Sequence, residues 1–325
     1  MSRAKARFGR ISSGQAYPSR SDDETRKFIR YWFDDYSRRQ LAALSDAIGR
    51  IRDNTTRDVL WCGFSRLIIT KQAGASLAMD LSHSRPHKAF ERAPIKPFNR
   101  FVAAVDAVVS NCPAKGDGPC GPATIVKQGD ARDLDIATGS IDLVVTSPPY
   151  LNAIDYMRCS KFSLVWMGHR VSELRKIRGE SVGAAVASKE AVESDGVKAV
   201  IKSLGLASKL SRRDCALLSQ YVFDMGRALA EASRVLRHKG RAVYVVGDST
   251  VRGTFIRNSA IVAAVAQEHG LSLSSRYSRA LPANRRYMPP PMREGSNGAM
   301  DGRMRREVVL VFDNSVPEQD RRRLG

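Results

Sequence analysis

The feature that most constrains this chain is a short apolar run that ends in two consecutive prolines. Residues 141–145 read Ile-Asp-Leu-Val-Val, a pattern typical of a buried strand, and Thr146-Ser147-Pro148-Pro149-Tyr150 follows at once. Because proline fixes φ and has no backbone N–H, a strand cannot continue through such a pair. The sequence therefore predicts a buried strand closed by a stiff turn, Ser147-Pro148-Pro149-Tyr150, hereafter the Ser147–Tyr150 corner.

Strands and helices alternate around this corner. Strands are expected at residues 124–128, 141–145, 242–246, 271–277 and 307–312. Helices are expected as a pair within 22–52 and over 59–69, 98–109, 208–238 and 259–268. This alternation indicates an α/β fold with a largely parallel sheet flanked by helices.

Composition and periodicity divide the chain into four parts. Residues 1–22 are rich in Ser, Gly and Arg without a hydrophobic period, so we expect a flexible basic arm. We expect a mainly helical segment at 23–122, the catalytic region at 123–313 and a charged tail at 314–325. His83 and His87 stand on either side of Pro86, which argues against a helix that would bring them together, so no metal site is expected.

The charge balance favours a polyanionic partner. Lys and Arg number 53 against 33 Asp and Glu, a formal net charge of +20. Nucleic acid is the natural partner for such a chain, and a solvated basic surface is the alternative. The five cysteines are odd in number and widely spaced, as in a reduced cytoplasmic protein. No apolar run is long enough for a membrane helix, so we expect no membrane association.

The corner has the groups needed to handle an aromatic amine. The exocyclic amine of cytosine or adenine is a poor nucleophile, since its lone pair is delocalised into the ring. Fixed acceptors for its two N–H bonds would localise that pair, and the hydroxyl of Ser147 and the carbonyl of Pro148 can be those acceptors. Tyr150 offers a flat face on which an extruded base can stack. The residues thus favour catalysis at an amine over a purely structural turn.

Residues 142–150, Asp-Leu-Val-Val-Thr-Ser-Pro-Pro-Tyr, resemble the catalytic motif of S-adenosylmethionine-dependent DNA amino-methyltransferases that modify cytosine N4 or adenine N6. The likeness extends over roughly residues 125–312, and by resemblance Ser147 favours cytosine N4. It implies a Rossmann-like class I methyltransferase sheet with helices on both faces and strand order 3-2-1-4-5-7-6. It also implies DNA methylation of the kind found in restriction-modification, with S-adenosylmethionine as cofactor.

The candidate site residues fall into three groups. The catalytic group is Ser147, Pro148, Pro149 and Tyr150. By resemblance to the family's acidic turn, which faces the adenine of the cofactor, the cofactor-binding group is Asp130, Ala131 and Thr146. Asp248, at the end of the 242–246 strand, is either a site residue or a turn cap. A mixture of arginine and tyrosine suited to phosphate contact and stacking gives the nucleic-acid-binding group: Arg276, Arg279, Arg285, Arg286, Tyr287 and Arg303.

One expected part is missing from the chain. The family's glycine-rich turn, similar to Asp-Pro-Phe-x-Gly-x-Gly, is not found, and residues 59–64, the nearest candidate, read as a core helix. The sheet is therefore expected to lack its first two strands, which would leave the 141–145 strand with an unpaired apolar edge. A second polypeptide that supplies those strands and the turn is one explanation, and a broken cofactor site is the other.

Three functions remain open at this point. The first is methylation of DNA amino groups, by this chain or by one half of a split enzyme. The second is methylation of RNA amino groups, since the chemistry at the base is identical. The third is a catalytically incomplete nucleic-acid-binding subunit, which the missing glycine-rich turn favours and the intact corner opposes.

Overall fold

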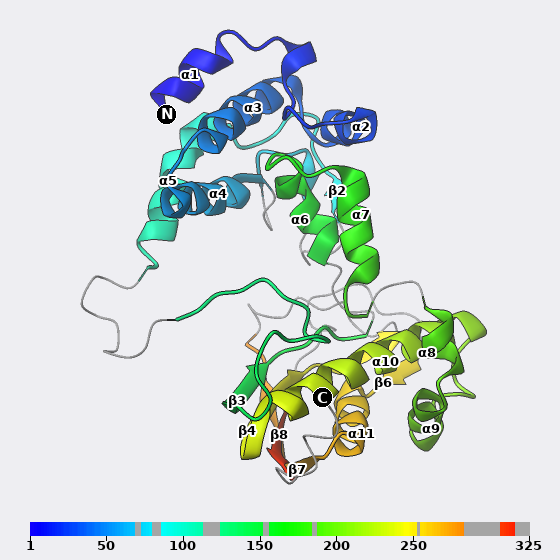
Figure 1. Ribbon diagram of the computed structural model, residues 1–325. Helices are drawn as coiled ribbons and strands as arrows, with labels where there is room; N and C mark the ends of the chain where they lie inside the picture. Colours follow the sequence, from blue (N-terminus) through cyan, green and yellow to red (C-terminus); the bar gives the residue numbers. More distant parts are fainter. Residues whose placement is uncertain are drawn as a thin grey trace. The chain divides into compact units, whose positions relative to one another are not determined.

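The structure is a computed structural model, and it describes residues 1–68, 73–79, 86–112, 124–151, 156–183, 187–251, 254–282 and 306–315. The chain forms two compact units (Figure 1). Unit 1 comprises Met1–Thr124 and Asp155–Arg178, and unit 2 comprises Ile125–Ile154 and Gly179–Gly325. The chain therefore leaves unit 2 just after the Ser147–Tyr150 corner and returns to it after a helical excursion.

Unit 1 is helical. Its elements are α1 (Ser2–Phe8), η1 (Ser13–Gln15), α2 (Asp23–Trp32), α3 (Asp35–Gly49), α4 (Asn54–Ile68), α5 (Pro97–Val109), α6 (Tyr156–Leu164) and α7 (Val171–Glu180), with β1 (Ala78–Met79) paired to β2 (His87–Lys88). Asp22 caps α2 by accepting from the Thr25 N–H, and Asp34 caps α3. The helices expected upstream of the corner are confirmed, and residues 59–64 lie in a helix as expected.

An aromatic core holds unit 1 together. Phe33, Phe64 and Phe162 are fully buried, and Trp166 lies against Phe33 with ring centroids 5.2 Å apart. The Ser45 hydroxyl of α3 donates to the Trp166 carbonyl at 2.5 Å. The segment that follows the corner is thus an integral part of the helical core rather than a surface loop.

Residues 1–22 are not the expected flexible arm. They contain α1 and η1, and Ala4, Ile11 and Ala16 are buried in the core of unit 1. The expectation was wrong because the apolar residues here are few, and only their spacing at positions 4, 8 and 11 places them on one face of a helical turn. Of the expected four parts, this first one is therefore a docked helical element.

Unit 2 is an α/β unit built on a four-stranded sheet. Its elements are β3 (Ile141–Thr146), α8 (Lys189–Glu193), α9 (Asp195–Ser203), α10 (Arg212–Val235), β4 (Leu236–Val246), β5 (Ser249–Val251), β6 (Thr254–Ile256), α11 (Asn258–Glu268), β7 (Leu271–Ala280) and β8 (Arg306–Asn314). The sheet order is β3-β4-β8-β7, with β3 parallel to β4 and β8 antiparallel to both of its neighbours. This arrangement corresponds to the 4-5-7-6 half of the expected order, so the expected α/β fold with an incomplete sheet is confirmed.

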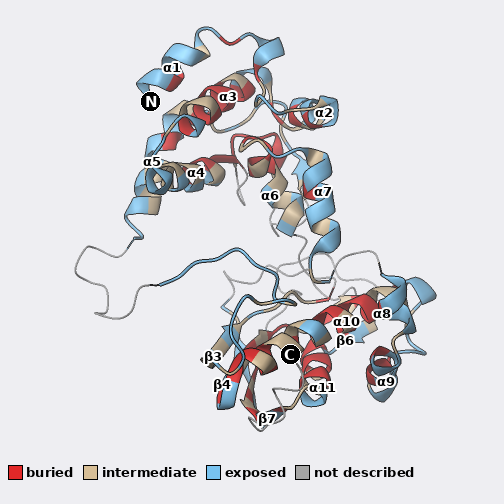
Figure 2. Ribbon diagram, in the orientation of Figure 1, coloured by how far each residue is buried: buried red, intermediate tan, exposed pale blue. Residues whose placement is uncertain are grey.

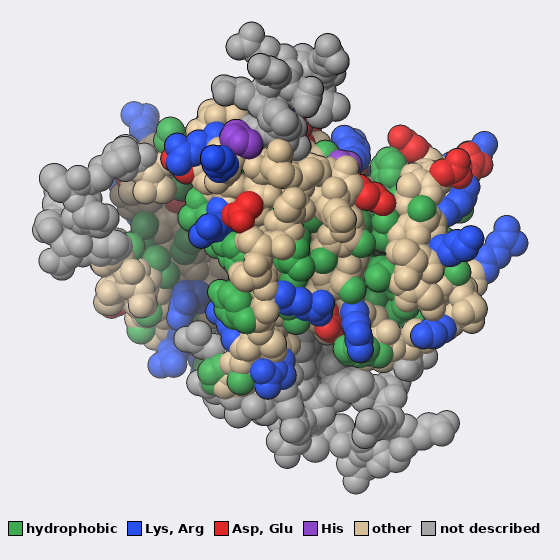
Figure 3. All heavy atoms as spheres, turned by 90° about the horizontal axis from the view of Figure 1, so that it is seen from below, with side chains coloured by type: hydrophobic (Ala, Val, Ile, Leu, Met, Phe, Trp, Pro, Cys, Tyr) green, Lys and Arg blue, Asp and Glu red, His purple; other side chains and the backbone are tan. Residues whose placement is uncertain are grey.

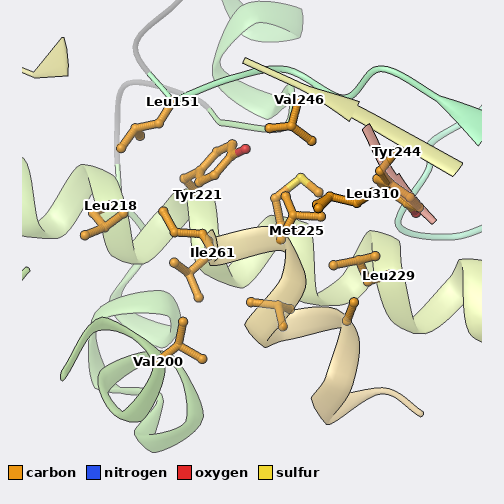
Figure 4. Packing of buried hydrophobic residues seen from close by; sticks show 14 of the residues in the cluster. Leu151, Val200, Leu218, Tyr221, Met225, Leu229, Tyr244, Val246, Ile261 and Leu310 are labelled. Carbon is orange, nitrogen blue, oxygen red and sulfur yellow. The ribbon is translucent and has the colours of Figure 1, made fainter. Parts of the chain in front are cut away.

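The core of unit 2 lies between one face of this sheet and the helices α10 and α11. Figure 4 shows Met225 of α10 beside Leu310 and Tyr244 of the sheet, and Tyr221 of α10 beside Val246. In Figure 2 the buried stripe of α10 is visible along its length. Among the described residues, helices cover this face alone, whereas we had expected helices on both faces.

Two expected elements differ in detail. Residues 124–128 do not form a strand, and Ile125 and Val126 are 79% and 90% exposed. No described strand pairs with them, and an unpaired segment gains none of the hydrogen bonds that define a strand. The long helix ends at Val235, before the expected stop at Lys239-Gly240, and those two residues form a bulge in which Lys239 has a φ of 63°.

Candidate active site at the end of strand β3

The Ser147–Tyr150 corner lies directly beyond the last paired residue of β3. Thr146 pairs with Tyr244 of β4, which fixes the corner beside the carboxyl ends of two parallel strands. In open α/β sheets ligands bind at such carboxyl ends, because side chains of several strands meet there. The position of the corner is therefore that of a binding site in this class of fold.

Ser147 is exposed, and its hydroxyl lies within hydrogen-bond distance of two other oxygen atoms. Its Oγ donates to the carbonyl of Val245 in β4 at 3.0 Å and lies 3.1 Å from the hydroxyl oxygen of Tyr150. A serine hydroxyl has one proton and two lone pairs. With the proton directed at Val245, Ser147 presents its lone pairs as hydrogen-bond acceptors.

Tyr150 is held by a second contact across the sheet. Its hydroxyl donates to Oε1 of Glu307 in β8 at 3.3 Å, and Oε2 of Glu307 accepts from Nε and Nη2 of Arg279 at 3.0 and 2.8 Å. The Glu307 side chain is only 13% exposed. A continuous set of polar contacts thus fixes the tyrosine from β7 through β8 to the corner.

The prolines shape the turn between these two side chains. Pro148 and Pro149 are half-buried, and the described part of the chain has no cis peptide bond. Within the same residues no donor reaches the carbonyl of Pro148. That carbonyl can therefore act as the second acceptor that the sequence predicted.

Asp130 and Ala131 lie in a separate turn held by Arg132. Asp130 accepts from Arg132 through both carboxylate oxygens, and Arg132 also donates to Asp224 of α10 at 2.7 Å. The hydrogen bonds from Arg132 lower the pKa of Asp130, and the same bonds raise the pKa of Arg132. Asp224 is buried, so this network anchors the turn to α10.

The structure brings part of the candidate set together. Thr146, Ser147, Pro148, Pro149 and Tyr150 share the end of β3, whereas Asp130 and Ala131 belong to the turn that Arg132 holds. Asp248 acts as a helix cap in this structure, since its Oδ1 accepts from the Ser259 N–H at the start of α11.

The candidate nucleic-acid residues are divided in the same way. Arg276 donates to the Ser259 hydroxyl at 3.0 Å, and Arg279 pairs with Glu307. Both guanidinium groups thus have partners inside unit 2. Arg285, Arg286, Tyr287 and Arg303 lie outside the described residues.

Sequence reasoning missed Glu307 and Tyr221. The β3–β4 and β4–β8 pairings bring Glu307 beside the corner, and the β7–β8 register places it opposite Arg279; nothing in the sequence gives these registers. Tyr221 of α10 is fully buried near Leu151 and Val246 (Figure 4), and among the described residues its hydroxyl has no hydrogen-bond partner. Burial raises the pKa of Tyr221, and nearby Tyr150 and Asp248 raise it further. Its place in an apolar helical repeat made it look like an ordinary core residue.

Metal ligation and membrane insertion find no support in the part of the chain that the structure describes. Those residues contain no cluster of His, Cys, Asp and Glu side chains able to hold a metal ion. Nor do they include a helix with the length and apolar composition needed to cross a membrane.

No protein-family model matches the chain, and no curated protein matches it significantly. Among solved structures, it is similar to a protein of Thermus thermophilus provisionally described as a DNA modification methylase, with 17% identity and a TM-score of 0.30 over 60% of this chain. A crystal of that protein with S-adenosyl-L-methionine gives 16% identity and a TM-score of 0.29. The chain spans 57% of the first structure and 56% of the second. Likeness at this level carries no argument about activity.

Proposed function

We propose that the Ser147–Tyr150 corner methylates an exocyclic amino group of a base in DNA, with S-adenosylmethionine as methyl donor. The observation that carries this proposal is the hydrogen bond from Ser147 Oγ to the Val245 carbonyl, because a hydroxyl that donates there has lone pairs for an incoming N–H. The resemblance of residues 142–150 to amino-methyltransferases supports the reaction class. The net charge of +20 supports a nucleic-acid substrate.

Each residue of the corner has a distinct task in this proposal. Ser147 and the Pro148 carbonyl accept the two N–H groups of the amine, which favours a pyramidal nitrogen whose lone pair is available. As positive charge builds on that nitrogen, both acceptors hold it more strongly. Tyr150, fixed through Glu307, offers its ring to the extruded base. When bound, S-adenosylmethionine would supply an electrophilic methyl group.

The residues that the structure describes do not by themselves give a complete site for that cofactor. The carboxylate of Asp130 is taken up by Arg132, and the sequence has no glycine-rich turn. We therefore propose a second polypeptide that carries the turn and the adjoining strands. The described residues pair β3 with β4 alone, and Leu143 and Val145 of β3 are 52% and 65% exposed. Parallel strands are ordinarily covered on both faces, so these side chains mark a face that an added helix would cover, and added strands would pair along the edge of β3.

Two finer choices follow from the same residues. Serine at position 147 favours cytosine N4 over adenine N6, by resemblance. RNA remains the alternative substrate, because the charge of the chain does not distinguish the two polymers. A catalytically incomplete nucleic-acid-binding subunit is the second candidate function, and the Asp130–Arg132 pairing favours it.

Reconstitution separates these candidates. The chain would be co-purified with a polypeptide that contains Asp-Pro-Phe-x-Gly-x-Gly and incubated with tritiated S-adenosylmethionine and either duplex DNA or RNA. The nucleosides would then be analysed by mass spectrometry. We expect label in N4-methylcytosine that depends on both polypeptides. Label in N6-methyladenine would change the target base, label in RNA alone would change the substrate, and no label in either polymer would leave the binding subunit as the function.

A further inference from the structure

The positive charge of the chain is concentrated in unit 1. By its residue ranges, unit 1 has 27 Lys and Arg against 14 Asp and Glu, and unit 2 has 26 against 19. On the face of the molecule in Figure 3, basic side chains stand scattered among hydrophobic and uncharged ones. Residues 1–21, by contrast, have five basic residues and no acidic one. The segment that was expected to be a flexible arm therefore has positive charge and no opposing negative charge of its own.

Three of these basic residues are arranged in a row by α1 and the turn that follows it. Ala4, Phe8 and Ile11 recur at helical spacing and face the core, with Ala4 and Ile11 buried. Arg3, Arg7 and Arg10 each stand one position earlier, so they form an adjacent row, and all three are exposed. Figure 2 shows α1 as a mainly exposed helix with a buried side.

Contacts from α3 hold this row in place. Arg39 donates through Nε to the Ile11 carbonyl at 2.8 Å, and its guanidinium lies over the Phe8 ring, 4.7 Å from the centroid. Phe8 also packs edge to face against Tyr36 and Phe98. A row of charges on a docked turn loses less conformational entropy on binding than the same charges on a disordered arm.

Little acidic charge opposes the row. Asp46 lies 3.8 Å from Nε of Arg7, but the same carboxylate binds Arg50 at 3.1 Å. Within the described residues no acidic side chain forms an ion pair with Arg3, Lys5 or Arg10. Nearby Tyr36 is 47% exposed, and Lys96 lies over its ring. The local surface therefore keeps a net positive charge with an aromatic side chain beside it.

We infer that the α1 row, Arg3, Arg7 and Arg10, is a docking surface for the phosphate backbone of duplex DNA. Guanidinium groups match phosphate geometry, and the row begins on α1 with Arg3 and Arg7 and ends at Arg10, two residues beyond the helix. An anionic membrane fits less well, since an interfacial helix must insert its apolar side, and here that side is buried in the protein. The inference rests on the proposed function only for the choice of DNA.

The test is the salt dependence of binding to a duplex DNA oligonucleotide by the full chain. Each lost phosphate contact lowers the slope of log affinity against log salt by about 0.9. R3A/R7A/R10A should lower the slope by about 2 to 3 and weaken binding at low salt by about a hundredfold. The matched control K189A/K198A/K202A removes equal charge from exposed sites on α8 and α9 and should change the slope far less. R3K/R7K/R10K keeps the charge and should keep the slope.

Other outcomes would overturn the inference. A control triple that lowers the slope as much as the α1 triple would show that net charge acts without a surface, and loss of the slope in the lysine variant would show that charge does not drive the contact. Loss of binding to duplex RNA or to anionic vesicles, with DNA binding intact, would give α1 another partner. Ser147→Ala should leave the slope unchanged, so failure of this docking surface is distinguishable from failure of the proposed methyl transfer.

Discussion

The hydroxyl of Tyr150 lies 3.3 Å from Oε1 of Glu307, a residue 157 positions further along the chain. This contact joins the Ser147–Tyr150 corner to β8 and, through the two bonds from Arg279, to β7. The orientation of the tyrosine ring therefore depends on the far edge of the sheet as well as on the prolines beside it.

Glu307→Ala should slow methyl transfer by the reconstituted enzyme about tenfold, because one hydrogen bond to a charged group contributes roughly 1.5 kcal/mol. The loss should appear in kcat, since Glu307 acts by positioning Tyr150. Glu307→Gln keeps an acceptor and should restore most of the rate. Glu268→Ala, an exposed glutamate on α11, is the control. An unchanged kcat in Glu307→Ala would show that the contact does not position the ring.

Asp224→Ala should destabilise unit 2 strongly. Asp224 is buried and accepts from Arg132 and from the Gly183 N–H, so its removal costs both of these hydrogen bonds, although Arg132 keeps Asp130 and the Glu180 carbonyl as partners. Loss of a hydrogen bond to a charged group costs about 1.5 to 3 kcal/mol. Hydrogen exchange of the β4 amides is the suitable probe, because all three tryptophans lie in unit 1. Asp195→Ala, whose side chain is exposed, should have little effect, and equal exchange in the two variants would contradict the assignment.

Glu231 should contribute to acid sensitivity. Hydrogen bonds from Arg234 lower its pKa, and it also accepts from the Leu134 N–H before β3. A carboxyl whose folded pKa is lowered stabilises the protein above its unfolded pKa of about 4.3, and that stability is lost as pH falls through the folded pKa. Glu231→Gln should therefore flatten the fall in unit 2 stability below about pH 4, measured by the same hydrogen exchange. If unit 2 of Glu231→Gln lost stability below about pH 4 as steeply as the unmodified chain does, Glu231 would not have this role.

The isolated chain should bind S-adenosylmethionine weakly. It has no glycine-rich turn, and Arg132 occupies the carboxylate of Asp130. Titration calorimetry should show no micromolar binding to the chain alone and binding once the second polypeptide is added. Micromolar binding to the chain alone would mean that its own residues complete the site.

Much of unit 2 could be predicted because its signals are local. The apolar run before Pro148 indicated β3, and the helical repeat from Leu217 to Leu236 indicated most of α10. The strand predicted at residues 124–128 is not formed, because apolar residues such as Ile125 form a strand only where a neighbouring strand pairs with them. The prediction of a flexible arm at residues 1–22 was wrong because three apolar side chains are too few to indicate a docked helical turn.

The candidate site also contains some residues that a local motif identifies and others that only the tertiary structure brings in. Ser147 and Tyr150 are close in sequence and could be identified from the motif, whereas Glu307 and Arg279 meet the corner only through strand register. Register depends on the partner strand, so it could not be read from either segment alone. The pairing of Asp130 with Arg132 could not be predicted from the sequence either, because Arg132 is also held by buried Asp224, which is distant in the sequence.

The most direct test of the central claim is the methyl-transfer rate of Ser147→Ala in the reconstituted enzyme. Ser147 is assigned to hold an N–H of the target amine, and that interaction strengthens as charge builds on nitrogen, so its loss should lower kcat and spare DNA affinity. One acceptor of this kind is worth about 3 kcal/mol, or roughly a hundredfold in rate. Ser140→Ala, just before β3, is the matched control and should keep full activity. A Ser147→Ala enzyme as fast as the control would show that the corner is only a structural turn.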